Sequence, residues 1–287
     1  MTLTAPKLIR VGHSPDPDDA FMFYALAKAK IPMRGFQVEH VIEDIETLNQ
    51  RAMRAELEVT AVSCHAYAYL ADHYAIMRSG ASVGNKYGPI LVAKAGTAGS
   101  GRPFSGADLR GKKIAVPGKM TTAYLVLQLF EKSFQPVFIP FDKIFEEVSA
   151  GRVDYGLIIH EGQITYQERG FQKVLDLGQW WYEKTARPLP LGVDVIRKDL
   201  GAETIRSFAS LFRESIEYAL AHRNPALEYA LEYGRGIGRS LGDQFVGMYV
   251  NEDTVELSRA SEEGLQRLLE EGYQQGILPQ KITPEFV

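Results

Sequence analysis

The sequence predicts an α/β protein built from two domains, and three observations lead to this fold class. Short apolar segments rich in β-branched residues alternate with longer segments of helical character, as in sheets whose strands are joined by helices. The chain has 287 residues, which is more than one hydrophobic core usually serves. A stretch rich in glycine and serine, residues 96–103, separates two such α/β units.

The first unit is predicted from alternating and apolar patterns near the N-terminus. Strands are expected over 8–12, 36–42 and 59–62. Helices are expected over 20–29, over 45–55 and directly after Ser63. Asp44 is a suitable cap for the second of these helices.

The second unit is expected to be inserted into the first. Strands are predicted over 90–93, 113–116, 137–140 and 155–159, with a helix over 121–130 and a helical segment ending near Gly151. Residues 189–196 are predicted to form a strand that returns to the first unit. The chain would then cross between domains near 90–96 and near 187–195. This gives a discontinuous larger domain, 1–92 plus 193–287, and an inserted smaller domain, 93–192.

The remaining residues show helical spacing of apolar side chains. Helices are predicted over 203–222, 225–233 and 255–272. We expect these helices to pack on the first domain.

Composition excludes several classes of function. The net charge is -4, and no basic block is present that would follow a nucleic-acid backbone. The single cysteine, Cys64, excludes an internal disulfide and a cysteine-rich metal site. No secretory signal is visible in residues 1–7, and no apolar segment is long enough to span a bilayer. The sequence therefore predicts a cytoplasmic protein with no membrane insertion.

The most informative position is His160, at the end of the predicted strand 155–159. In open α/β sheets, ligands bind outside the carboxyl ends of the strands. A titratable imidazole at this place can transfer protons as well as hydrogen-bond a loop. The sequence alone leaves both interpretations open.

Two further segments are predicted at strand ends, one in each domain. Thr122 and Ala123 begin a helix, where unpaired N–H groups can bind a carboxylate or phosphate. Ser63 follows the strand 59–62 and places a hydroxyl at the corresponding edge of the first domain. A ligand held between the domains would contact these residues and His160.

Several other segments resemble known binding or catalytic motifs but lack residues that those motifs need. The segment 106–113 has Lys113 where a phosphate-binding loop needs Ser or Thr, and it precedes a strand. Residues 234–238 lack the third glycine of a dinucleotide site. The adjacent residues Ser63, Cys64 and His65 do not face one another on a helix, so a nucleophile–base pair is not expected. Asp16, Asp18 and Asp19 suit helix capping better than a metal site, since no second acidic cluster completes a ligand set.

Five segments stand in the order found in one enzyme family. They are Ser14–Asp19, Ser63–Tyr67, Thr122-Ala123, His160–Gln163 and Leu189–Gly192. Over essentially its whole length, the chain resembles the 1,4-dihydroxy-6-naphthoate synthases of the futalosine route to menaquinone. The resemblance implies a fold like the type II periplasmic binding proteins, in which two α/β lobes joined by two crossover strands close on a ligand.

The resemblance also implies a reaction and its residues. It implies a lyase that converts cyclic dehypoxanthinylfutalosine, a small carboxylate, into 1,4-dihydroxy-6-naphthoate and dihydroxyacetone without a metal or organic cofactor. His160 falls on the proton-accepting histidine. The residues expected to bind substrate are Ala61, Val62, Ser63, Thr122, Ala123 and Asn49.

Two other functions fit a chain of this kind. A solute-binding protein of a transporter would share the fold, although no signal peptide or lipid-anchor cysteine is visible. Chorismate dehydratase of the same pathway is a lyase of related fold, but it would be expected to lack the segment His160–Gln163.

Overall fold

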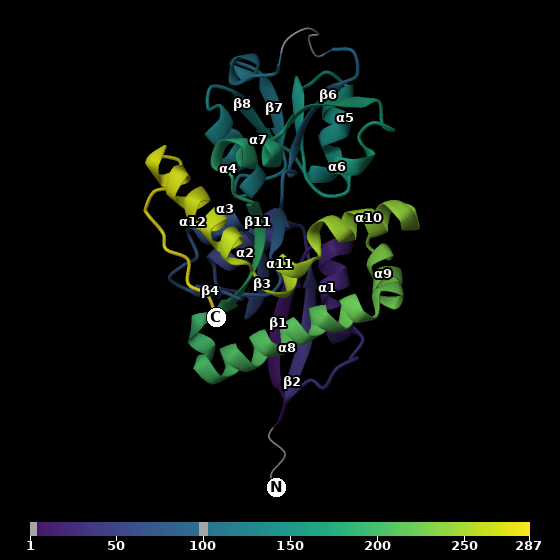
Figure 1. Cartoon of the computed structure of the whole chain (residues 1–287), viewed down its shortest axis with the longest axis vertical. Helices are drawn as coiled ribbons and strands as arrows, with labels where there is room; N and C mark the ends of the chain where they lie inside the picture. Colours follow the sequence, from purple (N-terminus) through teal and green to yellow (C-terminus); the bar gives the residue numbers. More distant parts are fainter. Residues whose placement is uncertain (1–4, 98–102) are drawn as a thin grey trace.

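The structure is a computed structural model that describes residues 5–97 and 103–287. Residues 1–4 and 98–102 lie outside the described part, so the predictions for the extreme N-terminus and for most of the Gly/Ser stretch are not addressed. Two lobes, each built on one sheet, lie one above the other (Figure 1). Within the described residues, no helix has the length and apolar character needed to cross a membrane.

The first lobe contains a mostly parallel sheet at its centre. Its strand order is β2-β1-β3-β11-β4, with β5 paired to β11. The strands are β1 (Lys7–His13), β2 (Phe36–Ile42), β3 (Val59–Ser63), β4 (Tyr74–Ile76), β5 (Ser82–Gly84) and β11 (Leu189–Arg197). Strand β1 runs parallel to β2 and β3, whereas β11 is antiparallel to β3.

The second lobe repeats this arrangement. Its strand order is β10-β6-β9-β7-β8. The strands are β6 (Ile90–Lys94), β7 (Lys113–Val116), β8 (Gln135–Phe138), β9 (Tyr155–Ile158) and β10 (Phe171–Asp176). Here β7 runs parallel to β8 and β9, and β6 is antiparallel to β9. Each lobe therefore has three parallel strands beside one strand of opposite direction.

The chain passes between the sheets earlier than the predicted boundaries at 92–93 and 192–193. Both boundaries fall inside strands. All of β6 pairs within the second sheet, and β11 pairs within the first sheet from Leu189 onward. The two passages therefore lie between Gly84 and Ile90 and between Asp176 and Leu189.

The helices of the first lobe cover its sheet and extend to the C-terminus. They are α1 (Pro17–Ala27), α2 (Ile45–Met53), α3 (Cys64–Tyr67), α8 (Ala202–Ala221), α9 (Arg223–Leu231), α10 (Arg239–Tyr249), α11 (Glu252–Val255) and α12 (Arg259–Gln274). Helix α1 begins with a proline and two aspartates, which suit the first turn of a helix. The Asp44 side chain caps α2 as predicted, by accepting from the N–H groups of Glu46 and Thr47. Helix α10 was not predicted from the sequence.

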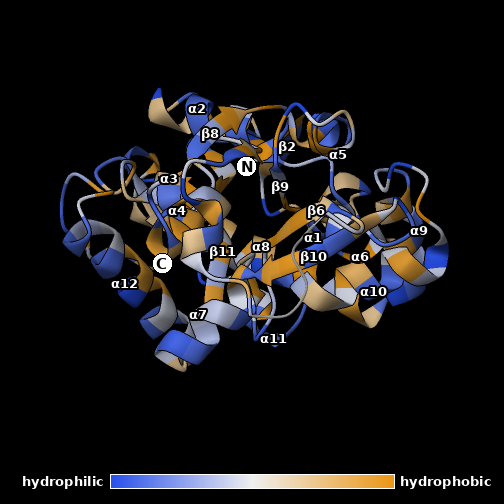
Figure 2. Ribbon diagram, turned by 90° about the horizontal axis from the view of Figure 1, so that it is seen from above, coloured by the Kyte–Doolittle hydropathy of each residue, from blue (hydrophilic) through white to orange (hydrophobic). Residues whose placement is uncertain are grey.

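The second lobe has shorter helices. They are α4 (Thr122–Phe130), α5 (Ile144–Ser149), α6 (Gly162–Thr165) and α7 (Leu177–Thr185). Figure 2 shows that β6 is strongly apolar, while α9 and α12 carry polar residues on the outside of the molecule. This is the distribution expected for strands buried on both faces and helices buried on one.

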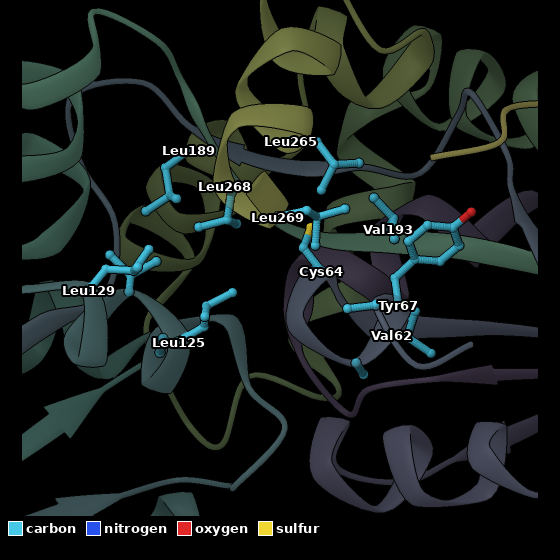
Figure 3. Close-up of a cluster of buried hydrophobic side chains, with 14 of the residues drawn as sticks. Val62, Cys64, Tyr67, Leu125, Leu129, Leu189, Val193, Leu265, Leu268 and Leu269 are labelled. Atoms are coloured by element: carbon cyan, nitrogen blue, oxygen red, sulfur yellow. The ribbon is translucent and has the colours of Figure 1, made fainter. Parts of the chain in front are cut away.

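One hydrophobic cluster joins the two lobes. It brings Val62 and Tyr67 of the first lobe together with Leu125 and Leu129 of α4, and α12 covers them with leucines that include Leu268 (Figure 3). The prediction that the C-terminal helices pack on the first domain is therefore incomplete, since α12 also packs on α4 of the second lobe.

Candidate active site between the lobes

A cavity lies where the carboxyl ends of β1, β3 and β9 meet the start of α4. Its empty space, mouth included, is about 740 Å³. The first lobe contributes 16 residues: Ser14, Asp16, Asp18, Asp19, Ile45, Ala61, Val62, Ser63, Gly80, Ser82, Leu191, Gly192, Val193, Asp194, Phe245 and Tyr249. The second lobe and the segment leading to it contribute Pro89, Thr121, Thr122, Ala123, Ile159, His160 and Gln163. Of the predicted site residues, only Asn49 does not line this cavity.

His160 follows β9 in a left-handed backbone conformation, with φ of 63°. A residue other than glycine is strained there by about 1–3 kcal/mol, and such strain clusters at functional sites. The ring stacks edge-to-face on Phe141, with 4.5 Å between centroids. Nδ1 lies 2.6 Å from Oδ2 of Asp16, while Nε2 has no hydrogen-bond partner among the described residues. One nitrogen is thus held by a carboxylate, and the other is buried without a hydrogen-bond partner among the described residues.

Asp16 belongs to a charge network that spans the lobes, in which the carboxylates of Asp16 and Glu161 are buried and the guanidinium of Arg235 is partly exposed. Its carboxylate also accepts hydrogen bonds from Ser14 Oγ at 2.7 Å and from Arg235 at 2.9 Å. The guanidinium of Arg235 donates to Glu161 as well, at 3.0 and 3.1 Å. Arg235 therefore links the loop before α1 with the segment that carries His160.

This network shifts the protonation of both partners. Burial alone would raise the pKa of Asp16, but the neighbouring His160 and Arg235 hold that pKa well below its usual range. Burial alone would lower the pKa of His160, but the Asp16 carboxylate outweighs it and raises that pKa above its ordinary value. An imidazole oriented by a carboxylate in this way is a suitable general base.

The start of α4 provides main-chain donors. Thr121 caps the helix by accepting from the N–H of Tyr124. The N–H groups of Thr122 and Ala123 lie in the first turn, where a helix has no acceptor for them. The Thr122 hydroxyl donates to the carbonyl of Leu191 at 2.6 Å, which fixes the helix start against β11.

Ser63 forms the opposing wall and is positioned by Asn49. The Asn49 amide donates to Ser63 Oγ at 3.2 Å, and its oxygen accepts from the Ser63 N–H at 2.9 Å. Asn49 is completely buried behind the serine. It therefore holds a lining residue in place instead of lining the cavity itself.

The neighbouring residues Cys64 and His65 have structural roles. Burial raises the pKa of the Cys64 thiol to about 12, so the thiolate is not accessible near neutral pH. Burial lowers the pKa of His65 to about 4, and its Nδ1 lies 3.3 Å from the carbonyl oxygen of Thr121. The expectation that these residues form no nucleophile–base pair agrees with this environment.

Sequence reasoning missed residues that α10 and the loop before it bring to the site. Phe245 and Tyr249 of α10 line the cavity, and the Tyr249 hydroxyl donates to Gln163 at 2.7 Å. Arg235 lies in the loop before α10. No local pattern marks these residues, because their importance depends on contacts with the other lobe. Among the described residues, no group of three or more His, Cys, Asp or Glu is placed to hold a metal ion.

Two α/β lobes with a cleft between them are the arrangement of the periplasmic-binding-protein fold. The alkanesulfonate-binding protein SsuA from Xanthomonas axonopodis, bound to MOPS, superposes with a TM-score of 0.73 at 12% identity, covering 98% of this chain and 97% of that one. This likeness confirms the predicted periplasmic-binding-protein-like fold. A crystal structure of an Archaeoglobus fulgidus protein superposes with a TM-score of 0.88 at 48% identity, covering 94% of this chain and 98% of that one.

Sequence comparisons identify the family. The profile described as menaquinone biosynthesis matches residues 9–274, and the chain belongs to this family. It is 38% identical over 281 residues to a 1,4-dihydroxy-6-naphthoate synthase from Thermus thermophilus, covering 98% of this chain and all of that one. It is 32% identical over 277 residues to a synthase of the same name from Streptomyces coelicolor, covering 94% and 95%. The predicted family is therefore confirmed, and an enzyme of menaquinone biosynthesis is supported.

Proposed function

We propose that this protein is a carbon–carbon lyase that converts cyclic dehypoxanthinylfutalosine into 1,4-dihydroxy-6-naphthoate and dihydroxyacetone. The observation that carries the proposal is the pair formed by Asp16 and His160, with Nδ1 of the ring 2.6 Å from the carboxylate and Nε2 without a partner in the part of the chain that the structure describes. A transporter's binding protein needs no such base at its ligand.

The substrate carboxylate would bind to main-chain N–H groups and a hydroxyl that the fold holds in place. The N–H groups of Thr122 and Ala123 lie at the positive end of the α4 dipole, and Ser63 Oγ can donate across the cavity. Neutral His160 would then remove a proton from the substrate. The carbon–carbon bond would break in a retro-aldol-like step that releases the three-carbon unit and leaves a ring that aromatises.

The raised pKa of His160 affects this step in two ways. A base with a higher pKa accepts a proton more readily, but a smaller fraction of it is neutral near pH 7. A positioned base usually contributes about 10²–10⁴ in rate. Closure of the lobes, which aligns the substrate and excludes water, would contribute further.

One assay separates the candidate functions. The purified protein is incubated with cyclic dehypoxanthinylfutalosine and, separately, with chorismate, and formation of the naphthoate is followed by chromatography and absorbance. Naphthoate from the first compound alone is expected. Conversion of chorismate would favour the dehydratase, and binding without conversion of either compound would favour a solute-binding role.

A further inference from the structure

The inner end of the cavity contains a carboxyl group that has no hydrogen-bond partner in residues 5–97 and 103–287. Asp194 lines the cavity, and only 1% of its surface is exposed to solvent. Its side chain forms no hydrogen bond within the described residues. Its Oδ1 is completely buried. A buried polar group without a partner destabilises the folded protein, so such a group in a binding cavity points to a ligand that completes its hydrogen bonds.

The surrounding residues leave room for this carboxyl group. A Cβ atom added to Gly80 would lie 2.2 Å from Oδ2 of Asp194, so only glycine fits there. A Cβ atom on Gly192 would make ordinary contact with the Val62 carbonyl oxygen at 3.6 Å, and both Gly192 and Asp194 line the cavity. Ala61, the register partner of Asp194, and Ser82 are small residues that also line the cavity.

The strand register gives the depth of Asp194. Gly192 pairs with Ser63, and Asp194 pairs with Ala61, two residues further into the first lobe. Two residues of a strand correspond to about 7 Å. Asp194 therefore lies well below the serine and the α4 start, at a depth that a two-ring ligand can reach.

The polar groups at the two ends of the cavity differ. Asp18 and Asp19 of α1 also line the cavity, with Asp19 near Asp194, and burial raises the pKa of both carboxyls, that of Asp19 to about 6. Burial and the nearby Asp19 likewise raise the pKa of Asp194. The opposite end presents main-chain N–H groups and hydroxyls. Main-chain N–H groups at the outer end attract a carboxylate, whereas the inner end offers carboxyl groups to which a hydroxyl can hydrogen-bond.

We propose that Asp194 recognises a hydroxyl group at the end of the substrate opposite to its carboxylate. The ligand then lies with its carboxylate at the start of α4 and its hydroxyl-bearing end toward β11 and α1. Asp194 is a specificity-determining residue that fixes this orientation. The assignment rests on the proposed function for the identity of the ligand, but its recognition chemistry can be tested without turnover.

The test measures binding of two naphthoates by titration calorimetry. 1,4-Dihydroxy-6-naphthoate carries hydroxyls opposite the carboxylate, and 2-naphthoate carries none. The unmodified protein should bind the dihydroxy compound about tenfold more tightly, the size of one well-placed hydrogen bond. Asp194→Ala should reduce this preference to less than about twofold, whereas Asp194→Asn, whose amide can donate and accept, should retain most of it.

Thermal unfolding of the empty protein separates recognition from a structural role. Removing an unpartnered carboxyl should leave the unfolding midpoint of Asp194→Ala unchanged or higher, and Asp72→Asn, at an exposed position, serves as control. An unchanged preference in Asp194→Ala, or no preference in the unmodified protein, would overturn the proposal. Failure of the unmodified protein to form naphthoate from the cyclic substrate would instead reject the proposed function, whatever the binding ratio.

Discussion

Oδ2 of Asp16 and Nδ1 of His160 lie 2.6 Å apart although the two residues belong to different lobes. Asp16 follows β1 of the first sheet, and His160 follows β9 of the second. The imidazole is therefore held by this carboxylate only when the lobes are together. If His160 is the base as proposed, this contact would couple proton transfer to closure of the lobes.

Replacing His160 with alanine tests the proposed base directly. The turnover number should fall by about 10²–10⁴ because the proton acceptor is lost. Binding of the naphthoate product, measured by calorimetry, should remain within a few fold. His73→Ala removes an exposed histidine and should leave the rate unchanged. Near-normal turnover in the His160 variant would remove this residue from its role.

Asp16→Asn tests how the base is tuned. Without the carboxylate, burial dominates and the pKa of His160 should fall. Activity requires the neutral ring, so it is lost as pH drops through that pKa. The acid limb of the kcat/KM profile should therefore lie above pH ~6.5 in the unmodified protein and move to lower pH in the variant. The rate on the plateau should also decrease, because the amide orients the ring less firmly. An acid limb at the same pH in both proteins would contradict the pairing.

Arg235→Gln tests the link between the lobes. The change removes the arginine partner of the buried carboxylates of Asp16 and Glu161, at a cost of roughly 1–3 kcal/mol in the free energy of unfolding. The free energy of unfolding of Arg235→Lys should lie between those of the unmodified protein and Arg235→Gln. A lysine keeps the positive charge but cannot make the same two-pronged hydrogen bonds. Urea unfolding measures this difference.

The control for Arg235 is Arg239→Gln, at a half-exposed position in α10. It should change the free energy of unfolding by less than about 0.5 kcal/mol. Equal stability of the Arg235 and Arg239 variants would show that the network contributes little.

Asn49→Ala tests the support behind Ser63. The serine N–H would lose its buried acceptor, which should lower the free energy of unfolding by about 1–3 kcal/mol. Because the lining serine would then be less fixed, KM should rise more than kcat falls. Gln50→Ala, on the exposed face of the same helix, is the matched control. A KM equal to that of the control would indicate that Asn49 serves stability alone.

The strand-end residues could be predicted from the sequence because the signal is local. An apolar strand that stops at His160, and a helix that starts at Thr122, can each be identified from a few neighbouring residues. The partners of these residues could not be predicted. Asp16 was interpreted as part of a capping cluster, and its contact with His160 depends on how two lobes meet. Asn49 was predicted to contact the substrate, but its side chain packs behind Ser63 and does not line the cavity. This placement depends on tertiary packing, which the local sequence does not show.

Strands and helices could likewise be predicted where the signal is local, and not where they depend on tertiary contacts. Long amphipathic or fully apolar segments, such as α8 and β3, were predicted close to their observed ends. The three-residue strands β4 and β5 were missed because they are too short to show a period and exist only through pairing with β11.

The two sides of the cleft are fastened by different forces. Hydrocarbon packing between α12 and α4 holds one side, and the ionic contacts of Arg235 hold the other. Water and dissolved salt compete with ionic contacts but not with a packed apolar seam. We therefore expect the lobes to hinge about the apolar side and to separate on the side of Arg235 and His160, so that ligands enter and leave there. Higher ionic strength should increase the rate of this opening.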